Sequence, residues 1–379
     1  MKIRTITVGV SGRPAPERVL EAGRQLARAV DYFESSGWVV QNARISLPHC
    51  DSYFGRLSER AVEDLLRCLD AICRENSVDF CSIGTARAPG HIEQIASVLP
   101  IAHRLAASAE VATKELGLLK ETSAAAIRAI QHVAHNTEDG FGALRFGCGF
   151  CIEPGYPFFP AAYQDEEAPC FSIGCENSDI LVEAFCGAGC LEEALSGYAD
   201  LLSMKYRSLE EAAIALADSL GVPYGGLDTS VAPSLCEEES ITRAFRAVGV
   251  EFGSPGTVAL CSAVTDVVKH VPVRRIGYCG IMLPVLEDVG LAKAADEGRY
   301  RISDLLTYTG VCGVGVDMVP IPGDFPEDRL RALIMDIAAV SLKLEKPLLL
   351  RLLPVPGKQV GEMTTFQCPY VCNGRIMEL

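Results

Sequence analysis

Short apolar segments alternate with amphipathic helical patterns along the whole chain, and this alternation restricts the possible folds more than any other feature. Residues 3–10 are apolar and β-branched, and the next stretch repeats Val19, Ala22, Leu26 and Val30 on one helical face. Alternating strands and helices predict an α/β fold. We expect about ten strands, among them 3–10, 38–47, 78–85, 142–151, 179–186, 224–233, 274–283, 311–319 and 346–355.

The helical patterns are distributed as evenly as the strands. A capped amphipathic helix is expected to begin near Ser58. No Gly/Ser linker, charge run or short repeat interrupts the chain, so we expect residues 1–379 to form one domain. If that domain consists of two halves, we expect them to divide near 187–220. Other helices are expected at 105–136, 190–220, 253–270 and 326–342.

The charge balance and the apolar runs limit the partners and the location. Thirty-four basic against forty-nine acidic residues give a net charge of −15, which repels a phosphate backbone and argues against nucleic acid. No apolar run has the length of a bilayer span, so we expect no membrane. The first residues read as a strand without a signal-peptide pattern, which favours a cytoplasmic location. The sixteen cysteines are then expected to be mostly buried, unpaired thiols.

The segment TYTGVCGVGVDMVPIPGD, residues 307–324, is the first candidate site. It keeps one thiol, Cys312, and one carboxylate, Asp317, among four glycines. Glycines let the backbone approach a ligand closely, and a thiol can serve as nucleophile, proton donor or metal ligand. The alternative is a strand end with a buried thiol, in which Asp317 caps a turn or the helix at 326–342.

The segment RFGCGFCIEPGYPFFPAAY is the second candidate. Arg145, Tyr156 and Phe158 would form an apolar pocket with a polar anchor, or else the segment is a packed Pro-aromatic loop. Cys148 and Cys151 form a C-x-x-C pair, but the helix that would follow it in a redox enzyme is missing from the pattern. A single such pair is weak support for zinc.

Polar residues at other strand ends add further candidates. Asp228 and Ser230 follow two glycines at a strand end, and Thr257 opens a helix whose amide groups would receive an anion. The sequence has neither a P-loop nor a Gly-x-Gly-x-x-Gly turn between strand and helix. Arg351, in a run of closely spaced cations, and Arg44, on the strand before His49, are candidate anion-binding residues. Arg87 and His91 form a weaker candidate in a loop.

The segments GVPYGGLDTSVAPS, VEFGSPGTVAL, GVCGVGVDMVPIPGD and LLLRLLPVPGKQVGE occur in an order and spacing that resembles domain-of-unknown-function family 711, also called uncharacterised protein family 0210. The resemblance implies a fold similar to the pyruvate formate-lyase-like barrel, in which about ten strands enclose a central loop. It would place the segment around Cys312 inside or at the mouth of the barrel.

Radical chemistry is not part of what the resemblance implies for this chain. The chain ends CPYVCNGRIMEL, without a glycyl-radical segment of the Arg-Val-x-Gly type, and Cys312 has no adjacent cysteine. The family has no settled activity to transfer.

Three functional hypotheses follow. The leading one is an enzyme for a small carboxylate or carbonyl compound, with Cys312 as nucleophile or acid, Asp317 and Asp228 for proton transfer, and Arg145 or Arg351 as a forked anion clamp. The second is a divalent-metal enzyme that uses the two aspartates with a histidine or thiol. The third is a non-catalytic metabolite-binding or dimeric regulatory barrel. We expect an anionic small-molecule substrate and a homodimer, and no cofactor can be named from the residues.

Overall fold

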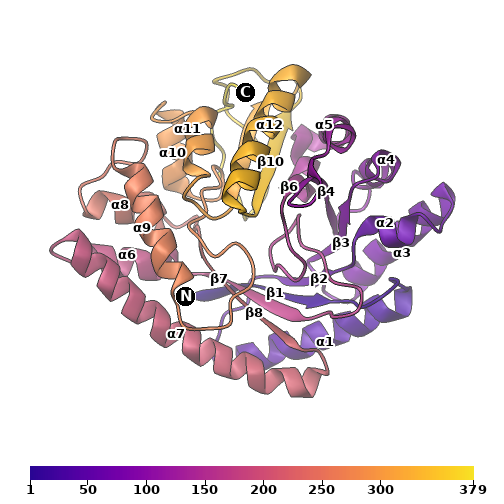
Figure 1. Ribbon diagram of the computed structural model, residues 1–379, viewed down its shortest axis with the longest axis horizontal. Coiled ribbons are helices and arrows are strands. Elements are labelled where there is room, and N and C mark those ends of the chain that lie inside the picture. Colours follow the sequence, from indigo (N-terminus) through magenta and orange to yellow (C-terminus); the bar gives the residue numbers. More distant parts are fainter.

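The computed structural model describes residues 1–379, and its central feature is one mixed sheet of ten strands. The strand order is β8-β7-β1-β2-β3-β4-β6-β10-β9, with β5 paired to β4. Figure 1 shows the strands in the middle of the molecule and the helices around the outside. The strands are β1 (Lys2–Gly9), β2 (Ala43–Ser46), β3 (Phe80–Ala86), β4 (Leu105–Thr113), β5 (Gly117–Leu118), β6 (Phe146–Phe150), β7 (Phe171–Glu176), β8 (Tyr224–Ala232), β9 (Gly315–Pro322) and β10 (Leu348–Val355).

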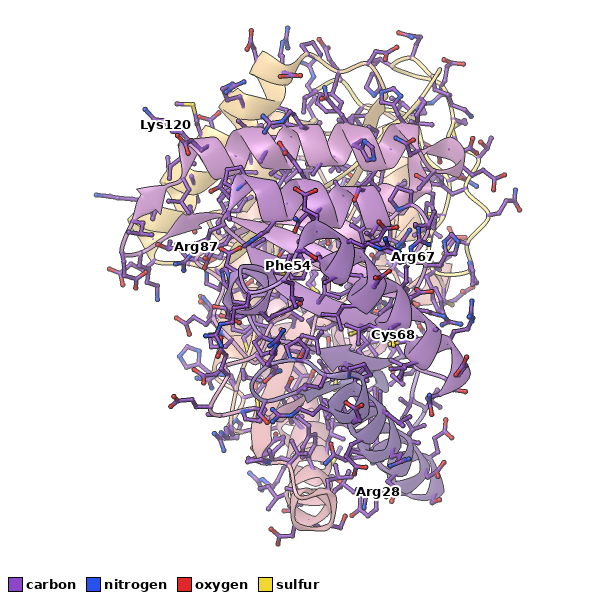
Figure 2. The ribbon with its side chains drawn as sticks, turned by 90° about the vertical axis from the view of Figure 1, so that its right-hand side faces the viewer. Arg28, Phe54, Arg67, Cys68, Arg87 and Lys120 are labelled. Carbon is purple, nitrogen blue, oxygen red and sulfur yellow. The ribbon has the colours of Figure 1, made fainter.

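The helices pack against the outer face of the sheet, and neighbouring helices along the chain contact one another. Figure 2 shows α3, α4 and α5 side by side over the strands of the first part of the chain. The α-helices are α1 (Pro16–Ser35), α2 (Cys50–Phe54), α3 (Glu59–Glu75), α4 (Pro89–Val98), α5 (Lys120–His135), α6 (Ser178–Gly187), α7 (Leu191–Leu220), α8 (Ile241–Ala247), α9 (Thr257–Lys269), α10 (Val289–Asp296), α11 (Ile302–Tyr308) and α12 (Glu327–Leu344). Two 3₁₀ helices, η1 (Glu138–Arg145) and η2 (Glu237–Glu239), complete the set.

Helix α3 illustrates how the sequence produces these outer helices. The hydroxyl of Ser58 accepts a hydrogen bond from the amide of Ala61, which satisfies one of the free donors at the helix start. Val62, Leu66 and Leu69 are buried on one face, and charged residues occupy the other. The apolar stripe at this spacing fixes which side of the helix packs on the sheet.

The strands form two groups that run in opposite directions. Strands β1, β2, β3, β4 and β6 are parallel to one another. Strands β7 and β8 are parallel to each other and antiparallel to β1, and β9 and β10 are parallel to each other and antiparallel to β6. The direction therefore changes across residues 151–170. The carboxyl ends of the two groups lie at opposite ends of the sheet.

The irregular segment 274–285 runs between β8 and β9, the two strands at the ends of the order. On one side Met282 donates its amide hydrogen bond to Val231 of β8. On the other side the amide of Val285 donates to the backbone carbonyl of Asp317 in β9. Strands β8 and β9 do not pair with each other directly, so the structure establishes a mixed α/β sheet but not the closed barrel of regular strands that we expected.

The loop of residues 151–165 crosses the inner face of the sheet, opposite the outer helices. Its backbone carbonyl groups accept hydrogen bonds from strand hydroxyls, for example Pro157 from Thr7 at 2.8 Å and Gly155 from Ser172 at 2.8 Å. The inner positions of these strands are small because the loop lies against them. A Cβ atom at Gly174 of β7, for instance, would lie 2.5 Å from the Phe158 ring. Both interpretations of this segment apply in part: it packs against the sheet as a loop, and Phe158 and Phe159 line a small cavity there.

Several expected elements differ from the observed ones. Residues 105–113 are strand β4 and not a helix, because full burial in the sheet overrides the helix propensity of their alanines. Residues 179–186 lie in helix α6 and not in a strand, and the strand we did not predict, β7, precedes them. Residues 274–283 form isolated bridges but no regular strand. None of the helices combines the length and the hydropathy that a membrane crossing requires.

Candidate functional site

The inner face of the sheet holds a small polar cavity of ≈ 40 Å³ into which three arginines project. Arg4 comes from β1, Arg44 from β2 and Arg351 from β10. Arg4 and Arg44 lie on neighbouring strands, whereas β3, β4 and β6 separate β10 from β2 in the strand order, so Arg351 reaches the same cavity from across the inner face. The other lining residues are Phe158, Phe159, Pro233, Tyr278, Met282, Pro284, Glu287, Val314, Asp317 and Leu349.

Two of the three arginines are neutralised by carboxylates. Arg351 donates to both oxygens of Asp317, with Nε–Oδ1 at 2.6 Å and Nη2–Oδ2 at 2.9 Å, and its Nη2 also reaches Glu287 at 2.9 Å. Arg4 pairs with Glu287 and, at 3.1 Å, with Glu176. The Asp317 and Arg351 side chains are 6% and 5% exposed, so this forked pair is largely shielded from solvent.

The third arginine, Arg44, is buried without a counter-ion. Its Nε has no hydrogen-bond partner, and the neighbouring carboxylates of Asp317 and Glu287 are engaged by Arg351 and Arg4. The guanidinium instead lies 4.3 Å from the centre of the Phe159 ring. Burial, together with the nearby cations Arg4 and Arg351, lowers the pKa of Arg44 to about 9, which still leaves it charged at pH 7.

An unpaired buried cation is costly, and proteins rarely keep one without a function. The Arg44 guanidinium presents a planar set of donors that matches a carboxylate or a phosphate. The cavity therefore has the features of an anion-binding site: one uncompensated positive charge, an aromatic platform and apolar walls.

Tyr278 contributes a second unpartnered polar group to the same cavity. Its hydroxyl is buried and has no hydrogen-bond partner. The residue lies in the irregular segment 274–285, and its ring packs edge-on against Tyr156 with centroids 5.3 Å apart. Burial raises the pKa of Tyr278 well above its ordinary value, so that the hydroxyl stays a hydrogen-bond donor.

Asp228 holds this segment in place. Its carboxylate accepts hydrogen bonds from the amides of Tyr278 at 2.8 Å and Cys279 at 3.1 Å, and also from the amide and hydroxyl of Ser230. Burial raises the pKa of Asp228 against the effect of these bonds. Gly277, which directly precedes Tyr278, has a φ of +105°, and a Cβ atom there would lie 2.1 Å from the Asp228 carboxylate. Asp228 and Ser230 are thus positioning residues for the Tyr278 backbone.

Cys312 lies in the hydrophobic core and not at the arginine cavity. It is 0% exposed, and burial raises the pKa of its thiol, an effect that the nearby Lys346 opposes. A thiol of this kind is a poor nucleophile because the thiolate is disfavoured. Asp317 lines the cavity but Cys312 does not, so the thiol lies away from the carboxylate with which the leading hypothesis combines it. The two residues are close in sequence but differ in environment because the chain enters β9 between them.

The other candidates are distributed between core and cavity. Arg145 donates to the carbonyl groups of Ala102 and Leu105 and so braces a loop. Burial lowers the pKa of Arg145 to about 10. The Thr257 hydroxyl donates to the Ser254 carbonyl at the start of α9. Of the remaining candidates, Arg44, Arg351, Asp317 and Phe158 line the cavity, while Tyr156 lines an outer groove. Tyr278 lines both.

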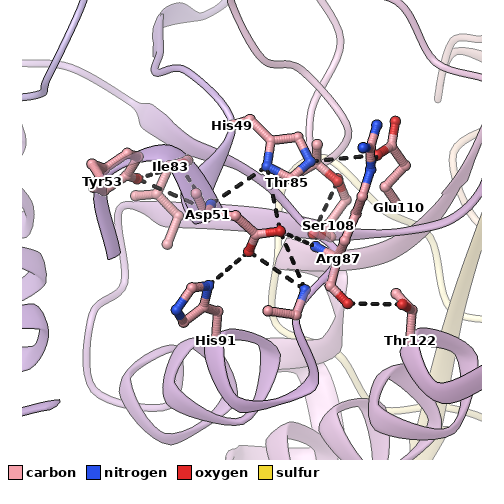
Figure 3. Close-up of polar contacts among 12 residues, drawn as sticks. His49, Asp51, Tyr53, Ile83, Thr85, Arg87, His91, Ser108, Glu110 and Thr122 are labelled. Atoms are coloured by element: carbon pink, nitrogen blue, oxygen red, sulfur yellow. Dashed lines mark hydrogen bonds and ion pairs between the residues drawn. The ribbon is translucent and has the colours of Figure 1, made fainter. Parts of the chain in front are cut away.

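A second polar cluster lies at the carboxyl ends of β2, β3 and β4 (Figure 3). Asp51 bonds His91 Nδ1 at 2.7 Å and accepts the amide of Arg87 at 3.0 Å. Buried Glu110 contacts the Arg87 guanidinium and lies 3.4 Å from His49 Nε2. Burial alone would raise the pKa of Glu110, but the bonds from His49 and Arg87 and their charges lower it overall. Asp51, Arg87, His91 and Glu110 each have a partner within the cluster, which distinguishes them from Arg44 in the arginine cavity.

No group of three or more His, Cys, Asp or Glu side chains is arranged to hold a metal ion. Cys148 and Cys151 are unpaired thiols, as are the other fourteen cysteines, in agreement with the expectation from the sequence.

Sequence reasoning did not select Arg4, Tyr278 and Glu287 as site residues. Arg4 carries a detectable signal, since it is a charged residue within an apolar strand. Tyr278 stands between two glycines in RRIGYCGIML, which was read as an ordinary strand. Glu287 has no local signal, because only the tertiary structure shows that it bridges two arginines.

The fold and the cavity define a mixed α/β protein with a small arginine-lined pocket on the inner face of its sheet. Comparison with known sequences places the chain more narrowly: residues 1–367 match the family described as uncharacterised ACR (DUF711), and the chain belongs to that family. It is 27% identical to a UPF0210 protein of Methanopyrus kandleri, over 96% of this chain and 88% of the relative. It is 30% identical to a UPF0210 protein of Pyrobaculum islandicum, over 81% of this chain and 71% of the relative.

Proposed function

We propose that the protein is an enzyme for a small carboxylate metabolite, which it binds in the arginine cavity with Arg44 as the anion clamp. The observation that carries the proposal is the buried Arg44 guanidinium without a counter-ion. A ligand carboxylate would supply the missing negative charge and form a forked pair of hydrogen bonds. The forked role that we assigned to Arg145 or Arg351 from the sequence passes to Arg44, because those two residues are already engaged.

The proposal does not use Cys312. Cys312 is buried in the core and does not line the cavity, so its thiol would not contact a ligand bound there. Asp317 and Glu287 are the carboxylates nearest to the bound anion, and as members of an ion-pair chain they would transfer protons only while that chain rearranges. The metal-dependent alternative receives no support, since Asp228 is committed to backbone amides and Asp317 to Arg351.

We also propose that the sheet closes into a barrel through segment 274–285. The support is the set of backbone hydrogen bonds that this segment makes to β8 on one side and to β9 on the other. Closure would explain why the cavity is shielded from solvent although β8 and β9 do not pair with each other.

Substitution of Arg44 by methionine tests the proposed function. Methionine keeps an apolar side chain in place of the arginine stem but removes the charge. Without ligand, we expect R44M to be as stable as the natural protein or more stable, because an unpaired buried charge is lost. With a short-chain carboxylate at a hundred times its Kd, the natural protein should gain about 2.7 kcal/mol and R44M should gain none.

The measurement is thermal unfolding against a series of acetate, glycolate and oxalate, with chloride at equal ionic strength as the reference. Arg28→Met, at the exposed arginine of α1 labelled in Figure 2, is the matched control and should respond as the natural protein does. Equal stabilisation of R44M, or no carboxylate effect beyond that of chloride, would contradict the proposal.

A further inference from the structure

The arginine cavity holds a second unsatisfied donor, and this restricts which carboxylates would fit. The Tyr278 hydroxyl and the Arg44 Nε are both buried without partners, and both residues line the cavity. The other unpartnered buried side-chain atoms belong to residues that do not line it: Gln94, Ser108, Ser178, Asp179 and Tyr224. Two orphaned donors in one cavity of ≈ 40 Å³ indicate a ligand with two acceptor groups a short distance apart.

The protein offers the Tyr278 hydroxyl no acceptor of its own. The nearby carboxylate of Asp317 receives two bonds from Arg351, and that of Glu287 is divided between Arg351 and Arg4.

The orientation of Tyr278 is also fixed in advance. Asp228 holds the backbone amides of Tyr278 and Cys279, and the edge-on contact with Tyr156 restricts the ring. A donor that cannot turn towards solvent contributes specificity, because a ligand that lacks the matching acceptor leaves it unsatisfied.

We infer that the ligand of the arginine cavity is a short-chain carboxylate with a second oxygen next to the carboxyl group, a 2-oxo or 2-hydroxy acid, and that Tyr278 donates a hydrogen bond to this second oxygen. The inference rests on the proposed function, since Arg44 must first hold the carboxylate. The apolar walls formed by Phe158, Val314 and Leu349 leave room for only a short carbon chain.

Three two-carbon acids of nearly equal size test the inference: acetate has no second oxygen, glycolate has a hydroxyl and glyoxylate has a carbonyl. Affinities measured by calorimetry should be about tenfold higher for glycolate or glyoxylate than for acetate. In Tyr278→Phe this preference should fall to about twofold or less, with the affinity for acetate unchanged. Because the hydroxyl has no partner, we expect Tyr278→Phe to fold as the natural protein does.

Tyr156→Phe is the matched control, since it removes a neighbouring tyrosine hydroxyl at the outer groove and should leave the preference intact. Equal binding of all three acids, or a preference that survives in Tyr278→Phe, would overturn the inference while leaving the proposed function in place. Failure of the natural protein to bind any of the three acids more tightly than R44M does would overturn both.

Discussion

Glu110 shows how a single residue in the second polar cluster links stability to pH. Its carboxylate is buried and is held by Arg87 and His49 at the carboxyl end of the first group of strands (Figure 3). Its pKa is lower in the folded protein than the ordinary 4.5. A carboxyl group with a lowered folded pKa contributes stability that is present above the unfolded pKa and is lost as pH falls through the folded value.

We therefore predict that Glu110→Gln destabilises the protein by about 1 kcal/mol at pH 7, because Arg87 is partly exposed and solvent screens the pair. The difference should shrink as pH falls from about 5 towards 3. Urea unfolding at a series of pH values measures it. Glu63→Gln, on the exposed Glu63–Arg67 pair of α3, should change stability by less than about 0.5 kcal/mol. A Glu110→Gln difference that stays constant from pH 7 to pH 3 would refute the assignment.

Two candidates from the sequence, Arg44 and Arg351, line the arginine cavity. Arg351 stands in a run of closely spaced cations and Arg44 on the strand before His49. Cys312 was selected on the composition of its neighbours alone. Composition does not tell whether glycines make room for a ligand or for another segment of backbone. Here they make room for backbone: a Cβ atom added to Gly313 would lie 2.8 Å from the carbonyl group of Gly280.

At the scale of elements, the inner loop 151–165 and the small residues beneath it depend on each other. The φ of Gly174 on β7 lies outside the left-handed region, so its backbone would accept a side chain. The space for that side chain is taken by Phe158 of the loop. We predict that Gly174→Ala costs about 1–3 kcal/mol through overpacking, and that adding Phe158→Leu recovers part of this loss. Urea unfolding of the two single variants and the double variant gives the coupling free energy.

Gly197→Ala on helix α7 is the control for the glycine substitution itself. No heavy atom lies within 4 Å of an added Cβ atom there, so the change should stabilise the protein by about 0.5–1 kcal/mol. If the stability changes of Gly174→Ala and Phe158→Leu simply added in the double variant, the Phe158 ring would not be what limits the space at Gly174.

The periodicity of apolar residues decides which elements are predictable from the sequence. The amphipathic helix at Glu59–Glu75 was recognised from its stripe of apolar residues. Strand β4 is buried along its whole length, so its pattern carries no period, and its alanines favoured a helix. Helix α6 contains three consecutive buried apolar residues, Ile180, Leu181 and Val182, and such a short run is equally typical of a strand.

At the scale of the whole molecule, the proposed closure of the sheet makes a prediction about hydrogen exchange. If segment 274–285 completes a barrel, the amides of Met282 and Val285, which bond to β8 and β9, should open only with the rest of the sheet. They should then exchange roughly a hundredfold more slowly than the amide of Glu115 in the exposed turn between β4 and β5. Exchange measured residue by residue by NMR provides the test.

An open sheet gives a different pattern. The amide of Met282 would remain protected against β8, whereas that of Val285, at the free edge, would exchange nearly as fast as Glu115. The comparison of two amides within one segment separates closure from general stability.

The sequence by itself determined the class of fold, an uninterrupted alternation of strands and helices, because periodic burial is written in the order of apolar residues. It also identified the family and two of the three arginines of the cavity. The tertiary structure alone decided that Arg4, Arg44 and Arg351 meet, that carboxylates satisfy two of them, and that Arg44 and Tyr278 are left without partners. A charge balance inside a protein depends on which strands become neighbours, and that order is set by packing over the whole chain.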